Sequence, residues 1–413
     1  MDAAAQETRP LGRQAPFVLY WLTRTSSALA YQMIAVAVGW QIYALTHSKL
    51  ALGMIGLAQF LPQLLLTLVA GAVADRFDRR VVSRICQAVA GCTAAFLAVG
   101  SFGLFGIHLH PAAIFVAVGV IGGARAFESP AMSALLARLV APTQFQRAAA
   151  AAAAAFQSAM IVGPALGGLL YAFGATVPYA TSATLYLLAS TFAAFIVQRQ
   201  QPAAAEREPV SRSSIFAGIA FIRSRPAILG AISLDLFAVL LGGATALLPV
   251  YASDILKTGP WGLGLLRSAP AIGALCTSAV LARWPLQRRV GLKMFAAVVV
   301  FGLGTLVFAI STWLPLSLVA LLVMGSSDMV SVVIRMSLVQ LSTPDEMRGR
   351  VSAVNSIFIG ASNQLGEFES GATAALFGPE GAVVLGGVGT LLVVGLWMRW
   401  FPELRRRKAL SGA

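Results

Sequence analysis

Charged residues are scarce in this sequence. Only 11% of its 413 residues are Asp, Glu, Lys or Arg, whereas a soluble globular protein carries about 25%. Hydrophobic residues make up 58% of the chain, and the mean hydropathy is +0.80. A soluble fold of this size could not keep so much apolar surface away from water. The composition therefore excludes a soluble domain and indicates an integral membrane protein.

Cysteine and histidine are also rare, with three residues of each. The cysteines fall in apolar segments, so no disulfide framework is expected. The histidines lie at predicted outer loops, in a pattern too sparse for a metal site. The chain has no phosphate-binding G-x-x-x-x-G-K-[ST] motif, so ATP does not drive its activity directly. No Ser-His-Asp or Cys-His set is present, and we expect no enzyme activity, no metal and no cofactor.

Long apolar runs dominate what is present. A helix needs about 20 apolar residues to cross a bilayer, and we predict twelve membrane-spanning helices. They cover residues 17–45, 50–74, 82–107, 112–140, 148–173, 177–198, 226–252, 261–283, 291–312, 314–341, 351–377 and 381–401. The first run is not a cleavable signal peptide, because it is too long and contains Arg24. The predicted fold class is therefore an all-α, multi-pass membrane protein.

The excess of basic residues reports orientation. The formal net charge is +14, and most Lys and Arg residues lie in one alternate set of loops, whereas the opposite loops hold Lys49 and Lys257. Basic loops stay in the cytoplasm, so both termini and the central loop are predicted to be cytoplasmic. Charge spread over many loops does not form a nucleic-acid surface. The expected partners are the lipid bilayer, protons and a small molecule, with the single chain as the functional unit.

The chain reads as two related halves. Residues 199–213 are polar and contain two prolines, which is typical of a linker, and residues 214–223 have the spacing of a short helix lying on the inner membrane face. We predict a six-helix bundle over 1–198, a cytoplasmic linker over 199–225, and a second bundle with a basic tail over 226–413. Matching residues recur 203 positions apart: Gly122 and Gly325, Arg147 and Arg350, Gly163 and Gly366, Gly168 and Gly371. Such a duplication places a substrate site near the membrane midplane, between the halves.

A few ionisable residues lie inside the predicted spans. Each costs at least about 2.5–3.5 kcal/mol at mid-bilayer, so each needs a partner or a water-filled cavity. They fall mainly on spans one, four, seven and ten, and we expect one cavity lined by these spans. The candidate cavity residues are Arg24, Tyr31, Gln32, Arg125, Asp235, Asp328, Arg335 and Asn355. The candidate proton-carrying residues are Asp235, Glu128, Asp328 and Glu367.

Spacing along the helices suggests pairs. Arg125 and Glu128 are three residues apart and share a helix face, and Asp328 and Arg335 are two turns apart. Interhelical salt bridges that only fix the packing are the alternative reading of these residues. Asp235 has no local partner in the sequence, so it is the first candidate for taking up and releasing a proton. Arg24 shares its helix face with Tyr31 and would meet an anionic or phenolic substrate.

The loop between spans two and three carries a specific pattern. Gly71, Asp75 and Arg76 are followed by Asp78 and the pair Arg79-Arg80. The pattern resembles the G-x-x-x-D-R-x-G-R-R signature of the major facilitator superfamily, with Asp78 in place of the usual glycine. The resemblance implies that this loop locks the cytoplasmic helix ends in one conformation and releases them in the other. We therefore name Gly71, Asp75, Arg76, Arg79 and Arg80 as a conformational lock.

A second motif lies in span five. Gly163, Pro164, Gly167 and Gly168 resemble the G-P-x-x-G-G motif associated with exporters of that superfamily. Proline removes one helix hydrogen bond and the glycines permit close helix approach, so the motif predicts a helix bend. A packing kink without further function is the alternative.

Further stretches resemble the enterobactin-exporter-like, drug–proton antiporter branch of the superfamily. They are residues 125–131, 217–223, 328–335, 343–355 and 362–371. The resemblance implies a multi-pass protein of a bacterial cytoplasmic membrane that exports a small amphipathic molecule, a siderophore or a drug, in exchange for protons by alternating access. The alternatives are an importer or facilitator of a small organic solute on the same fold and, more remotely, a non-transporting membrane sensor.

Overall fold

A computed structural model describes residues 10–103, 109–197, 212–286 and 288–409 of the chain. Within these residues the regular elements are all helices. The chain divides into two compact units. The first unit holds residues 1–45 and 58–209, and the second holds residues 46–57 and 210–413.

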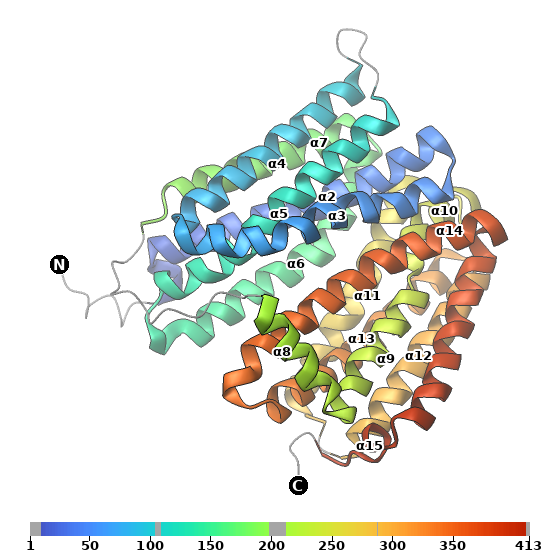
Figure 1. Cartoon of the computed structure of the whole chain (residues 1–413). Coiled ribbons are helices and arrows are strands. Elements are labelled where there is room, and N and C mark those ends of the chain that lie inside the picture. Colours follow the sequence, from blue (N-terminus) through green and yellow to red (C-terminus); the bar gives the residue numbers. More distant parts are fainter. Residues whose placement is uncertain (1–9, 104–108, 198–211, 287, 410–413) are drawn as a thin grey trace. The chain divides into compact units, whose positions relative to one another are not determined.

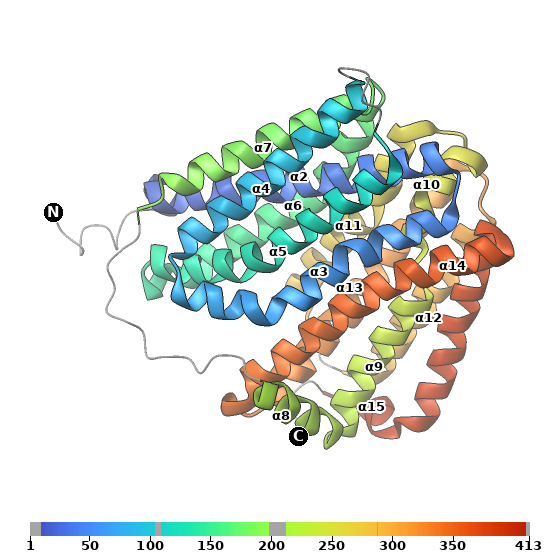
Figure 2. The same cartoon turned by 45° about the horizontal axis from the view of Figure 1, so that its top comes forward.

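The helices of the first unit are α2 (Ala15–Thr46), most of α3 (Lys49–Arg76), α4 (Arg79–Phe102), α5 (Pro111–Leu139), α6 (Phe145–Tyr171) and α7 (Thr176–Ala194). Single-turn 3₁₀ segments lie at Leu11–Arg13 and Pro142–Gln144. In both cartoon views α4 and α7 run along one another (Figures 1 and 2).

The helices of the second unit are α8 (Arg212–Arg223), α9 (Pro226–Leu241), α10 (Leu248–Val250), α11 (Gly259–Arg283), α12 (Val290–Ile310), α13 (Leu314–Ser342), α14 (Asp345–Trp400) and α15 (Pro402–Arg406). A 3₁₀ turn, η4 (Ala244–Leu247), and a π turn, η5 (Tyr251–Ile255), flank α10. Figure 1 shows α9, α12 and the second half of α14 side by side, with α8 crossing near one end.

The number of membrane-spanning segments agrees with the sequence. Ten helices among the described residues are long and apolar enough to cross a membrane. One of them, α14, is two legs joined at Gly378, whose φ of 80° is not helical. The 19-residue α7 is not among the ten, and counting it and both legs of α14 gives the twelve predicted spans. The predicted all-helical fold class is thus confirmed, while the cytoplasmic location of the termini stays a prediction.

Helices are the expected outcome for these apolar runs, because in lipid each backbone N–H and C=O must find a partner within its own segment. Several helices start with a proline in their first turn, where no N–H is needed. Among the described residues, the helices that begin in this way are α5, α9, α10, α11, α13 and α15.

The seventh predicted span, 226–252, lies in the segment Pro226–Ile255, which is long and apolar enough to cross a membrane, but this segment is not one continuous helix. Helix α9 ends at Leu241, and Gly242 and Gly243 leave the helical ladder before η4 begins. The Ser370 hydroxyl donates to the carbonyl of Gly243 at 2.9 Å, which replaces part of the hydrogen bonding that the break removes. Irregular backbone is tolerated within a membrane where protein satisfies it.

The repeated glycines occupy equivalent places in the two units. A Cβ on Gly122 of α5 would overlap the backbone carbonyl of Gln59 on α3. A Cβ on Gly325 of α13 would overlap the carbonyl of Pro270 on α11 in the same manner. Both glycines therefore let a neighbouring helix approach to backbone contact, which supports the duplication inferred from the 203-residue spacing.

The first residues of α3, up to residue 57, belong to the second unit, whereas the rest of the helix belongs to the first unit. A Cβ on Gly53 would lie 3.0 Å from Cα of Gly371 and from two carbonyl oxygens of α14. Two facing glycines permit this approach. The predicted division into 1–198, 199–225 and 226–413 stays a prediction.

The linker contains the short helix that its apolar spacing predicted. Helix α8 packs against α9 and the start of α14, and its Ile222 is buried in a cluster with Ile228, Val351 and Val354. A Cβ on Gly218 would be 2.9 Å from the carbonyl of Arg350. The part of the linker at 198–211 lies outside the described residues.

Candidate functional site

The candidate residues gather in two polar clusters, one in each unit. Arg24 and Tyr31 on α2 lie close to Arg125 and Glu128 on α5 in the first unit. In the second unit the cluster consists of Asp235 on α9, Asp328 and Arg335 on α13, and Asn355 on α14. Each cluster lies within helices long enough to cross a membrane, where isolated charges are costly.

Glu128 is buried and hydrogen-bonded to neutral donors. Its Oε1 accepts from the Ser27 hydroxyl at 2.5 Å and from Nε2 of Gln87 at 2.9 Å. Among the described ion pairs, Glu128 is not matched with Arg125, although the two residues line the same cavity. Gln87 was not among the predicted cavity residues, although a polar residue in the middle of an apolar span signals such a role.

Both arginines of the first unit lie over aromatic rings. The guanidinium carbon of Arg125 is 3.7 Å from the ring centroid of Tyr31, and that of Arg24 is 5.8 Å from the ring centroid of Phe156. The Tyr31 hydroxyl accepts a hydrogen bond from Gln59. Cation–π contacts of this kind hold a guanidinium in place without neutralising its charge.

A cavity of about 70 Å³ opens beside these arginines. One water needs about 10–15 Å³ of such space, so the cavity has room for a polar head group with several atoms. It lies among α2, α5 and α6, and its lining residues are Arg24, Ser27, Ala28, Arg125, Glu128, Ser129, Met132 and Phe156.

The second cluster is centred on a buried ion pair. Nη2 of Arg335 lies 3.3 Å from Oδ2 of Asp235, and both side chains are less than one-tenth exposed. Nη1 of Arg335 donates to Oδ1 of Asn355 at 2.9 Å. Asp235, for which the sequence offered no local partner, thus has one on another helix, and Asp328, the partner suggested by spacing, lies within electrostatic reach of the same guanidinium.

Asp328 shares a small pocket with Asp235. The pocket measures about 10 Å³, which is room for about one water. Ser327 and Ser331 also line it, and the Ser331 hydroxyl lies 3.5 Å from Oδ1 of Asp235, a long contact. With both carboxyl groups ionised, two carboxylates beside a single guanidinium would carry an excess of one negative charge. The space suits a proton or a water rather than a larger solute.

Two candidates lie apart from these clusters. Glu367 on α14 faces the start of α3, where a Cβ on Gly56 would be 2.8 Å from its Oε2. Gln32 donates to the sulfur of Met160 on α6. Neither Glu367 nor Gln32 lines the two cavities described above.

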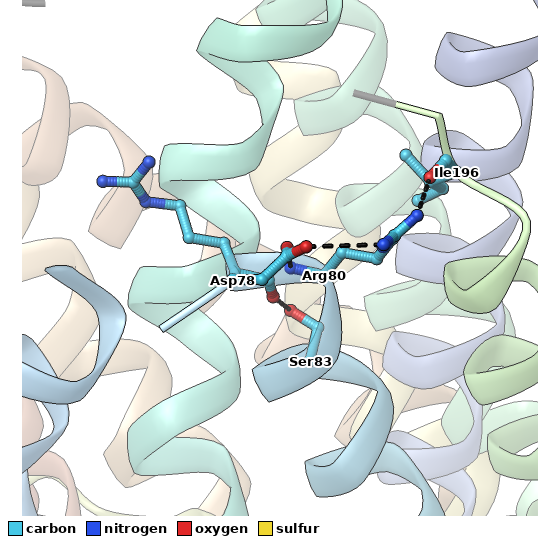
Figure 3. A network of polar contacts seen from close by, with 5 residues as sticks. Asp78, Arg80, Ser83 and Ile196 are labelled. Atoms are coloured by element: carbon cyan, nitrogen blue, oxygen red, sulfur yellow. Dashed lines mark hydrogen bonds and ion pairs between the residues drawn. The ribbon is translucent and has the colours of Figure 1, made fainter. Parts of the chain in front are cut away.

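The loop between α3 and α4 is held by Asp78 and Arg80 (Figure 3). Asp78 is the N-cap of α4 and accepts from the backbone N–H of Arg80 at 2.9 Å, which is the usual role of Asp at a helix start. Nη1 of Arg80 reaches the carbonyl of Ile196, just beyond α7, at 2.9 Å. Gly71, Asp75 and Arg76 belong to the end of α3, but the side chain of Asp75 lies outside the described residues.

The glycine–proline motif of α6 lies against α2. A Cβ on Gly163 would be 2.5 Å from Cβ of Gln32, and one on Gly167 would be 3.0 Å from Cα of Met33. Gly163, Pro164, Gly167 and Gly168 are all buried within α6. The motif thus provides close helix approach.

Groups of three or more His, Cys, Asp or Glu residues that would hold a metal ion do not occur in the described parts of the chain. The three cysteines are free, and Cys86 is the buried one.

Comparison with known proteins adds independent findings. The model of the Major Facilitator Superfamily matches residues 20–367. The multidrug efflux pump Tap of Mycolicibacterium fortuitum is 28% identical over 413 residues, which cover 95% of this chain and 97% of that protein. The enterobactin exporter EntS of Citrobacter koseri is 26% identical over 403 residues, covering 94% and 92% of the two chains.

Solved structures resemble the fold. A bacterial homolog of the human lysosomal transporter Spinster matches with a TM-score of 0.73 at 11% identity, over 96% of this chain and 97% of that chain. The nucleoside transporter NupG matches with a TM-score of 0.67 at 14% identity, over 94% and 99%. At these identities the likeness concerns the fold alone.

Proposed function

This chain belongs to the Major Facilitator Superfamily of membrane transporters, and from that premise we propose that it is a proton-coupled exporter of small amphipathic molecules. The observation that carries the proposal is the buried group of Asp235, Asp328 and Arg335 beside a pocket of about 10 Å³. Export is favoured because the similar proteins Tap and EntS are named as an efflux pump and an exporter. We place the protein in a bacterial cytoplasmic membrane.

The second cluster can carry a proton because its charges do not balance. Arg335 pairs with Asp235, and Asp328 lines the same pocket. One proton on either carboxyl group would make the group of three side chains neutral. Since isolated charge is costly in a membrane, the protonated and deprotonated states would favour different arrangements of α9 and α13.

Coupling follows if substrate and proton prefer different conformations. A ligand shifts a conformational equilibrium only by its difference in affinity for the two states. In the proposed cycle, substrate binds from the cytoplasm, alternating access exposes it outside, and a proton entering the Asp235–Asp328 pocket returns the empty protein. The start of α4 and the end of α7, which Arg80 joins through the carbonyl of Ile196, would act as the conformational lock together with the end of α3.

The test is substrate efflux from proteoliposomes with an imposed pH gradient. The purified protein is reconstituted, and a siderophore, a macrolide and a lipophilic cation are offered separately. The proposal expects movement of a substrate against the direction of the proton gradient, with loss of accumulation when a protonophore is added. Movement in the same direction as protons would identify an importer, and movement that ignores the pH gradient would identify a facilitator.

A further inference from the structure

The cavity of the first unit contains more positive than negative charge. Arg24 and Arg125 line it together with the single carboxylate of Glu128. We infer that this cavity binds an anionic aromatic group, a carboxylate or phenolate carried on a ring, as the recognised part of the transported molecule. This assignment of a substrate class rests on the proposed function for its biological use, but the binding step is testable without transport.

The carboxylate of Glu128 does not use up the two guanidinium groups. Glu128 accepts from Ser27 and Gln87, and the ion pairs of the described residues match neither Arg24 nor Arg125 with an acid. Nε of Arg24 is buried and has no hydrogen-bond partner among the described residues. A guanidinium offers five N–H donors, and a buried donor without a partner is costly. The hydroxyls of Tyr20 and Tyr186 contact Arg24 and Arg125, and an incoming anion would satisfy donors that these contacts leave open, Nε of Arg24 among them.

The rings near the arginines indicate the rest of the ligand. Arg125 lies over Tyr31 and Arg24 over Phe156, and a guanidinium can form two parallel hydrogen bonds to a carboxylate. Phe156, Met132 and Ala28 supply apolar lining to the same cavity. A thioether and an aromatic side chain both pack favourably on a ring. An aromatic anion therefore matches both parts of the lining.

The cavities of the two units differ in charge and in volume, and this difference assigns substrate binding to one unit and proton binding to the other. The pocket of the second unit is lined by Asp235 and Asp328 and measures about 10 Å³, so it would repel an anion and is too small for a ring. The cavity of the first unit measures about 70 Å³ and carries the opposite charge. A lipophilic cation would meet an excess of positive charge there, and an aliphatic anion would leave the ring faces unused.

The experiment compares three ligands with the same ring. Binding of 1-naphthoate, 1-naphthamide and 1-naphthylmethylammonium to the purified full-length protein is measured by titration calorimetry in nanodiscs of zwitterionic lipid. Cyclohexanecarboxylate and a short-chain anionic phospholipid are added as non-aromatic anions. We expect 1-naphthoate to bind about tenfold or more tightly than each of the other four probes, since hydrogen bonds to charged groups are the stronger ones.

Variants assign the binding to this cavity. Arg24→Gln and Arg125→Gln should each weaken 1-naphthoate by about tenfold and leave 1-naphthamide within about twofold, while Arg24→Lys keeps part of the affinity. Arg84→Gln, which changes an exposed arginine of the same unit, is the matched control. If Arg125→Gln is not recovered as folded protein, Arg24→Gln and Arg24→Lys decide.

Several results would overturn the inference. They are a cation or a non-aromatic anion that binds as tightly as 1-naphthoate, and naphthoate binding that is unchanged in folded Arg24→Gln. The outcome is independent of the efflux assay. Arginine-dependent naphthoate binding without pH-driven efflux would reject the proposed function alone, and efflux of a cation that is insensitive to Arg24→Gln would reject this substrate class alone.

Discussion

Asp235 and Arg335 come from different helices and meet as a buried ion pair, with 3.3 Å between Oδ2 and Nη2. The same guanidinium reaches Asn355 through Nη1 at 2.9 Å. Arg335 of α13 therefore binds α9 through a charge and α14 through an amide. One side chain joins three membrane-spanning helices of the second unit at the place where a proton is proposed to act.

Removing one partner of this pair should destabilise the protein. Arg335→Gln leaves the carboxylates of Asp235 and Asp328 buried without their cation, and breaking a buried pair in this way costs about 3–5 kcal/mol. Thermal unfolding in detergent should show a lowered midpoint. The double variant Asp235→Asn/Arg335→Gln should recover part of the loss, and the exposed Arg283→Gln should have no effect. Equal midpoints for Arg335→Gln and the native chain would show that the ion pair contributes nothing.

The carboxylates of Asp235 and Asp328 should be required for coupling substrate efflux to proton entry, but not for substrate binding. Asp328→Asn removes the acid that lines the pocket without an ion pair among the described contacts, and Asp235→Asn removes its neighbour. We expect both variants to lose efflux driven by a pH gradient, by about tenfold or more, while substrate affinity stays within a few-fold. Efflux in proteoliposomes and equilibrium binding are the two measurements.

Glu367→Gln is the matched comparison for this coupling test, because Glu367 lies away from the pocket. Normal pH-driven efflux in both aspartate variants would remove this pocket from the mechanism. Loss of efflux in Glu367→Gln alone would move the proton site to α14.

The equivalent glycines should tolerate no side chain. Gly122→Ala and Gly325→Ala each place a methyl group on the backbone carbonyl of a neighbouring helix, and overpacking of this kind typically costs about 1–3 kcal/mol. Gly395→Ala is the control, because a Cβ there meets nothing within 4 Å and alanine favours a helix by up to about 1 kcal/mol. Thermal midpoints should fall for the first two variants and stay equal or rise for the third.

Variants at the start of α4 should distinguish an effect on the stability of the loop from an effect on the rate of transport. Asp78→Ala removes the hydrogen bond to the Arg80 backbone, a loss of about 1 kcal/mol, whereas Asp78→Asn retains an acceptor. Arg80→Gln loses the contact with the Ile196 carbonyl and should slow substrate turnover several-fold at unchanged substrate affinity.

Asp75→Ala should slow turnover in the same way if Asp75 belongs to the lock. Arg84→Gln is the neutral comparison for the loop variants. Initial rates of efflux and equilibrium binding distinguish these effects, and full turnover in both Arg80→Gln and Asp75→Ala would reject the lock.

The sequence predicted the helical fold well because long apolar runs in a membrane have few structural choices. The duplication was also visible, since glycines at helix contacts recur at a constant spacing. The break in α9 was missed, because Gly242 and Gly243 interrupt the helix without interrupting the apolar run. Hydrophobicity indicates that a segment lies within the membrane, but it does not indicate where the backbone inside that segment departs from a helix.

The partners of the charged residues on other helices were not predicted. Spacing along one helix favoured Arg335 with Asp328 and Arg125 with Glu128, and each pair interacts electrostatically. The ion pair of Arg335 with Asp235 and the hydrogen bonds of Glu128 with Ser27 and Gln87 come from other helices. Contacts within a helix follow from the sequence period. Contacts between helices depend on how far each helix is rotated about its axis and on its depth in the membrane, and neither quantity can be read from the sequence.

Gly122 and Gly325, which permit backbone contact in both units, have a consequence for how the two units diverged. Arg125 and Asp328 lie three residues after them and also 203 positions apart, yet they carry opposite charges. One turn of helix thus holds an inherited steric constraint next to a position whose charge is free to change. A duplicated scaffold of this kind can acquire a cation-bearing half and an acid-bearing half by point substitution, without any rearrangement of its helices.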